Sequence, residues 1–139
     1  MISASCVVKV YSRRSFVVDG LPDLLDEHLA RLERSAALMG LMLPTAGVWH
    51  RGVDAAVRAW QGGPEMAVRL VLARGAEHDQ IISYVLADPV SPTVMTQRRN
   101  GASALSLDRG IDYHLAGRAP WLLTGAKTLS YAVNMAALR

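Results

Sequence analysis

The period of the hydrophobic residues changes once along the chain, and this change does most to limit the possible fold. Between residues 23 and 60, apolar side chains recur at steps of three and four, which is the period of a helix. From residue 65 they recur at every second position, which is the period of a strand. Two helices followed by paired strands predict an α+β domain in which both helices pack on an antiparallel sheet.

The first helix is predicted to follow a turn at Asp19-Gly20 and Pro22. Asp23 is in the position of an N-cap, and Gly40 is in the position of the residue that ends the helix. The residues expected on its buried face are Leu25, Leu29, Leu32, Ala36 and Met39.

The second helix is predicted to begin at Thr45 and to end at the "GGP" of residues 62–64. The stretch "EMAVRLVLARG" at 65–75 then reads as a strand, and "IISYVLA" at 81–87 as its partner in an antiparallel hairpin. "GASALSL" at 101–107 is predicted to form a third, weaker strand. The residues expected on the buried face of this helix are Trp49, Val53, Ala56 and Trp60.

Composition places the chain among globular proteins and leaves its ligand open. The 139 residues are 51% hydrophobic and 19% charged, which suits one domain with its own core. The net charge of +3 suits an anionic ligand but is too small to demand a nucleic-acid partner. Neither a secretory signal nor a stretch long enough to span a membrane is evident, so we expect a cytoplasmic protein without a membrane partner.

Two further site classes receive little support from the sequence. Cys6 is the only cysteine, which excludes an intramolecular disulfide, and the four histidines lack the spacing of metal ligands. The Arg pairs at 13–14 and 98–99 could form a basic patch, but no aromatic or groove-reading motif accompanies them. We therefore expect no metal and no nucleic-acid partner.

Lys127 is the first of two candidate site residues. A lysine near a helix start is ordinarily a solvated side chain. Burying an ammonium without a partner is costly, however, and lowers the pKa of the amine. A neutral amine is what a covalent catalyst requires. The apolar neighbours that favour this second interpretation are Trp121, Leu122, Leu123, Ala126 and Leu129.

Arg31 is the second candidate. Glu27 precedes it by four residues, so the two could form an exposed contact worth about 0.3–0.5 kcal/mol. The other interpretation makes Arg31 a phosphate ligand, because the planar guanidinium suits such groups.

Four segments resemble the fold-type IV pyridoxal-phosphate enzymes in their order and spacing. "LLDEHLARLERSAALMGL" at 24–41 is similar to the first helix of that family, and "VRLVLARG" at 68–75 to a strand with an Arg-Gly turn. "RRNGASALSLDRG" at 98–110 resembles the next strand. "PWLLTGAKTLSYAVNMAALR" at 120–139 resembles the segment with the Schiff-base lysine. Its sequence is most similar to that of actinobacterial aminodeoxychorismate lyases.

The resemblance implies roles for three residues and a cofactor. Lys127 would be the lysine that binds pyridoxal 5'-phosphate, Arg31 a ligand of its phosphate, and Tyr131 a weaker candidate near the cofactor. The implied reaction converts aminodeoxychorismate to 4-aminobenzoate, a folate precursor, and pyruvate. Two alternatives stay open: a class IV aminotransferase for branched-chain or D-amino acids, and a non-catalytic remnant that acts only by association.

The resemblance also implies a division of the chain. Residues 1–118 would form the small α+β domain, although residues 1–16 lack the family's Gly-rich strand. Residues 119–139 would form a linker and the start of the cofactor-binding domain. Family members act as homodimers with a further domain, so we expect this chain alone to bind the cofactor weakly and to be inactive.

Overall fold

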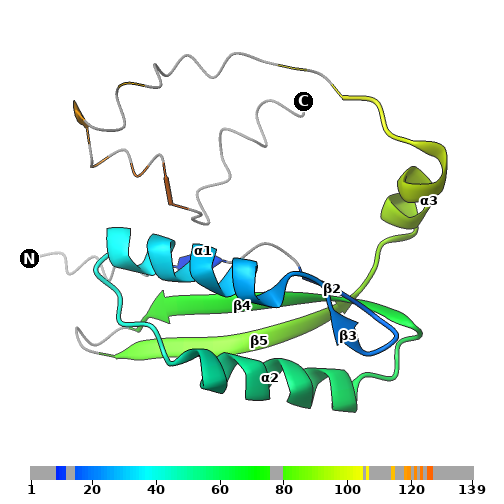
Figure 1. The fold of residues 1–139 in the computed structure, drawn as a ribbon, viewed down its shortest axis with the longest axis horizontal. Coiled ribbons are helices and arrows are strands. Elements are labelled where there is room, and N and C mark those ends of the chain that lie inside the picture. Colours follow the sequence, from blue (N-terminus) through cyan, green and yellow to red (C-terminus); the bar gives the residue numbers. More distant parts are fainter. Residues whose placement is uncertain are drawn as a thin grey trace, which may run out of the picture.

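The chain folds as an antiparallel sheet with two long helices against it (Figure 1). The computed structural model describes residues 9–11, 15–75, 80–104, 106, 114, 118–119, 121, 123 and 125–126. Its elements are β1 (Lys9–Tyr11), β2 (Ser15–Val18), β3 (Leu21–Pro22), α1 (Leu25–Leu38), α2 (Ala46–Ala59), β4 (Glu65–Arg74), β5 (Ile81–Pro89) and α3 (Pro92–Asn100). The predicted α+β class, with both helices packed on an antiparallel sheet, is confirmed.

Strand β4 is the centre of the sheet. On one edge it pairs with β5 along its length, from Met66 opposite Pro89 to Arg74 opposite Ile81. Its other edge is shared by β1 and β2, and β3 extends the sheet beyond β2. The predicted hairpin at 65–75 and 81–87 is therefore confirmed.

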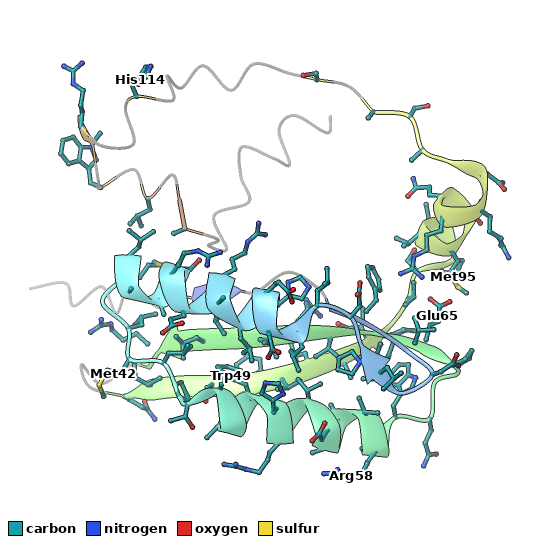
Figure 2. The ribbon with its side chains drawn as sticks, in the orientation of Figure 1. Met42, Trp49, Arg58, Glu65, Met95 and His114 are labelled. Carbon is teal, nitrogen blue, oxygen red and sulfur yellow. The ribbon has the colours of Figure 1, made fainter. Side chains whose placement is uncertain are left out.

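Both helices bury their apolar stripes on the same face of β4. Leu32 of α1 and Val53 of α2 are fully buried there, together with Leu70 of β4. Figure 2 shows Trp49 on the side of α2 that faces the sheet. The buried members of this core are Val17, Leu25, Leu29, Leu32, Ala36, Leu41, Trp49, Val53, Met66, Val68, Leu70 and Leu72.

The opposite face of β4 is buried as well, which simple alternation did not predict. Ala67, Val71 and Ala73 are each at most 2% exposed. Each of them has a strand partner on both edges of β4, in β1 or β2 on one side and in β5 on the other. Alternation therefore located the strand without showing which of its faces is exposed.

The beginning of α1 differs from the prediction. Leu24, and not Asp23, is the N-cap, with a left-handed backbone at φ 50° and no side-chain hydrogen bond as a cap. The backbone N–H of Asp23 donates to the carbonyl of Phe16 at 2.8 Å. Asp23 is thus still held by β2, which moves the cap one residue along the chain.

The end of α1 follows the prediction. Gly40 has a left-handed φ of 61°, and its N–H donates to the carbonyl of Ala37 at 3.1 Å. The N–H of Leu41 donates to the carbonyl of Ala36 at 2.9 Å. These two bonds are those of a Schellman motif, in which glycine takes the left-handed position without steric cost.

The predicted turn at Asp19-Gly20 is a tight hairpin between β2 and β3. Val18 lies opposite Leu21, so the loop has two residues, and both have positive φ, 50° and 79°. Asp-Gly is a preferred pair for this type I′ geometry.

Helix α3 was not predicted, and the strand expected at 101–107 is wrong for the residues described there. Pro92 is at the start of α3, a position that proline favours, and Gly101 ends it with φ 81°. Residues 101–104 and 106 have no strand structure. Helix α3 buries none of its residues, so the hydrophobic pattern carried no signal for it.

Candidate functional site

Arg31 lies on the exposed side of α1, opposite the leucines that anchor this helix. Leu29 and Leu32 are buried in the core on either side of it in the sequence, while Arg31 itself is exposed. Its carbonyl accepts a hydrogen bond from the hydroxyl of Ser35 at 3.0 Å, and Ser35 is fully buried. The backbone beneath Arg31 is therefore fixed, and its side chain extends from a packed helix.

The guanidinium of Arg31 forms no ion pair with any residue that the structure describes. The contact with Glu27 that the spacing allows is not among these described ion pairs. An exposed guanidinium that is not engaged by a carboxylate can bind an oxyanion with two parallel hydrogen bonds. The chemistry of this residue thus fits a phosphate group.

The end of α1 is tied to the sheet. The Nη2 of Arg74, the last residue of β4, donates to the carbonyl of Gly40 at 3.1 Å. Leu41 is 6% exposed and belongs to the core. These contacts fix the last turn of α1 to the end of the central strand.

Gly125, two residues before Lys127, lies against this end of α1. A Cβ atom placed on Gly125 would be 3.6 Å from Cδ1 of Leu38. Around Gly125 the chain makes a turn in which the N–H of Ala126 donates to the carbonyl of Leu123 at 2.9 Å. A residue far along the sequence is thus brought to the helix that carries Arg31.

Leu38 and Arg31 lie on the same side of α1. Leu38 follows Arg31 by seven positions (38 − 31), which is close to two helical turns and about 10 Å along the axis. The contact of Gly125 with Leu38 therefore lies on the face that presents Arg31. Sequence reasoning missed this contact, because the spacing of Leu38 and Arg31 on α1 gives no sign of which distant residue packs there.

Two of the three predicted site residues lie outside the described residues. Lys127 and Tyr131 are among them, so their roles stay predictions. Trp121, from the same apolar stretch, is 75% exposed.

Arg98 of the possible basic patch is already engaged. Its Nη1 donates to Glu65 at 2.6 Å, and its guanidinium lies 4.2 Å from the centre of the Phe16 ring. Figure 2 shows Glu65 at the start of β4 beside α3, where Met95 also lies. Arg13 and Arg14 lie outside the described residues.

The described residues form neither a metal site nor a membrane span. Among these residues, no three His, Cys, Asp or Glu side chains come together as possible metal ligands. No helix in this part of the chain has both the length and the apolar character that a membrane span requires.

Comparison with known proteins connects this arrangement to one family. Residues 13–139 match the model of the class IV amino-transferases. The chain is 44% identical over 126 residues to a bifunctional aminodeoxychorismate lyase / D-amino acid transaminase of Mycobacterium tuberculosis, covering 88% of this chain and 44% of that protein.

Solved structures give the same result. A hypothetical aminotransferase from Mycobacterium tuberculosis, in its pyridoxal-phosphate-bound form, matches with a TM-score of 0.83 and 40% identity over 94% of this chain and 47% of its own. A fold IV transaminase from Curtobacterium pusillum matches with a TM-score of 0.81 and 38% identity over 98% of this chain and 47% of its own. The chain thus spans less than half the length of these relatives. The cofactor that the sequence predicted is the one bound in the first of these structures.

Proposed function

The chain belongs to the class IV aminotransferase family, and from this premise we propose that it supplies two anchors of a pyridoxal-phosphate site, Arg31 and Lys127. The reaction we propose for the enzyme is that of an aminodeoxychorismate lyase, which forms 4-aminobenzoate and pyruvate. One observation carries the proposal: Gly125, two residues before Lys127, lies on the face of α1 that presents Arg31. Covalent geometry allows about 7 Å between residues 125 and 127.

Each residue has a role that its chemistry suits. Arg31 would bind the phosphate, since its exposed guanidinium forms no ion pair with a described residue. Lys127 would hold the cofactor, and its Nζ would then carry a proton to and from the carbon that bears the substrate's amino group. Tyr131 would lie near the ring as a weaker contributor. The cofactor, when bound, supplies an electron sink for negative charge on that carbon.

A class IV transaminase is the second candidate. One relative from Mycobacterium tuberculosis has been solved in an alpha-ketoglutarate- and PMP-bound form, and another relative is a D-amino acid transaminase as well as a lyase. Release of 4-aminobenzoate and pyruvate from aminodeoxychorismate would support the lyase. Amino transfer to a 2-oxo acid would support the transaminase.

A third candidate is a chain that associates without catalysis. Trp121 and Met42 are 75% and 80% exposed, and exposed apolar side chains favour association. A homodimer is also part of the enzymatic proposal. Light scattering across a range of concentrations, with and without the cofactor, separates the two: association without any cofactor binding would favour the third candidate.

The decisive test is to add pyridoxal phosphate, record the absorbance spectrum, reduce with borohydride and map the labelled peptide. The sequence makes this test sharp because it holds only two lysines, Lys9 and Lys127, so Lys9 is an internal control. Because we expect this chain alone to bind the cofactor weakly, pyridoxal phosphate is added in excess, and we expect the pyridoxyl adduct on Lys127 and not on Lys9. Equal labelling of both lysines, or of neither, would contradict the proposal.

A matched pair of variants tests the phosphate ligand. Arg31→Gln should weaken cofactor binding by about tenfold or more, because a charge-assisted bond to phosphate is lost. Arg58→Gln is the control: Arg58 is an exposed arginine on α2, away from α1 (Figure 2). Equal affinity in both variants would remove Arg31 from the site.

A further inference from the structure

Leu38 is an exposed leucine with a specific contact. It is the last residue of α1, is 53% exposed and is not part of the buried core. Single exposed leucines are common on protein surfaces and ordinarily need no explanation. This one differs because its Cδ1 lies 3.6 Å from the position that a Cβ on Gly125 would occupy.

The backbone that carries Leu38 has little freedom. Directly after it, the Schellman bonds of Gly40 and Leu41 close the helix, and Arg74 binds the carbonyl of Gly40. Leu41 is anchored in the core. Leu38 therefore extends from a rigid end of α1. A segment that packs on Leu38 is held at a fixed distance from the sheet.

We infer that Leu38 is a positioning residue for Lys127. The inference rests on the proposed function, in which Arg31 holds one end of the cofactor and Lys127 the other. Pyridoxal phosphate has a rigid ring, so both anchors must be held at a nearly constant separation. Leu38 shares its helix face with Arg31 and contacts the chain two residues before Lys127, so its side chain sets that separation.

The glycine at position 125 fits this role. A Cβ there would make ordinary van der Waals contact with Leu38, so alanine fits and a branched side chain would press on the leucine. The two positions are therefore expected to be coupled by size, which a purely local effect of either residue would not produce.

The test compares cofactor affinity and adduct yield on Lys127 in variants of the whole 139-residue chain. Leu38→Ala should bind pyridoxal phosphate about tenfold more weakly, since small displacements of a reacting group are costly. Leu38→Met should restore binding because it refills the same space. Met42→Ala is the control, an 80% exposed apolar residue just beyond α1. The thermal unfolding midpoint should be the same in all four proteins, which excludes general loss of structure.

A second pair of variants tests the coupling. Gly125→Val should also weaken binding, and the double variant with Leu38→Ala should regain most of the lost affinity. Losses that simply add in the double variant would overturn the inference, as would normal loading of Leu38→Ala. If the parental chain itself does not load Lys127, the proposed function fails and this inference with it. If the parental chain loads and Leu38→Ala loads equally well, only the inference fails.

Discussion

Helices α1 and α3 are attached to the same sheet by different means. Helix α1 buries Leu25, Leu29, Leu32 and Ala36, together with the hydroxyl of Ser35. Helix α3 buries none of its residues, and Arg98 binds it to the sheet through an ion pair and a ring contact. Apolar burial is strong and cooperative, whereas a half-exposed ion pair is weak. The candidate site is built on α1, the helix that has a fixed position.

The largest expected effect on stability comes from the buried core that holds α1. Leu32 is fully buried beneath α1, so Leu32→Ala should lower the free energy of unfolding by about 2–5 kcal/mol. Met95→Ala on α3 is the control and should change it by no more than about 0.5 kcal/mol, because no residue of α3 is buried. Urea denaturation followed by circular dichroism measures both. A comparable loss in the two variants would mean that α3 is part of the cooperative core.

The two helix ends give the second test. Gly40 and Gly101 both have positive φ, 61° and 81°, where an L side chain is strained. Gly40→Ala should cost about 1 kcal/mol of global stability, since the end of α1 is tied to Leu41 and Arg74 and cannot relax.

Gly101→Ala is expected to behave differently, because α3 is weakly attached and can unwind locally to relieve the strain. Its unfolding midpoint in urea should stay at the parental value, while amide exchange in α3 becomes faster. A full loss of global stability in this variant would show that α3 is held as firmly as α1.

The same contrast explains what the sequence could and could not predict. Helix α1, helix α2 and the β4–β5 hairpin bury regular stripes, and periodicity located all three. Helix α3 has no stripe, so its only signals were Pro92 and Gly101 at its ends. Asp23 was assigned as a cap because its residue type fits, but its backbone pairing with Phe16 outweighs that preference.

The candidate site also has one part that the sequence could predict and one part that it could not. Arg31 could be chosen from the sequence through the family resemblance, and the structure gives its exposed position and the absence of the Glu27 contact from the described ion pairs. The contact between Leu38 and Gly125 joins residues 87 positions apart (125 − 38), and no local pattern encodes such a distance. Only the packing of the chain shows it.

The third prediction concerns the attachment of α3. Arg98→Ala removes the 2.6 Å bond to Glu65 and the contact with Phe16. Together these two contacts should stabilise the attachment of α3 to the sheet by about 1 kcal/mol. We expect faster amide exchange across α3 and an unchanged global midpoint. High salt should produce part of the same effect in the parental chain, because it screens exposed charges.

Arg99→Ala is the matched control for this variant, since Arg99 is an exposed neighbour on the same helix. It should leave exchange in α3 at the parental rate. Equal rates in the two variants, or no response of the parental chain to salt, would show that Arg98 does not hold the helix.

The smallest expected effect belongs to the polar contact that α1 makes with α2. Nε2 of His50 lies 3.1 Å from Oδ1 of Asp26, and these side chains are 43% and 85% exposed. Asp26→Asn should change the free energy of unfolding by no more than about 0.5 kcal/mol, because the leucines beneath already fix α1. This contact is of the same kind as the one that holds α3, yet here it is redundant. A loss above about 1 kcal/mol in urea denaturation would show that α1 also depends on its polar rim, and the contrast between the two helices would then be one of degree.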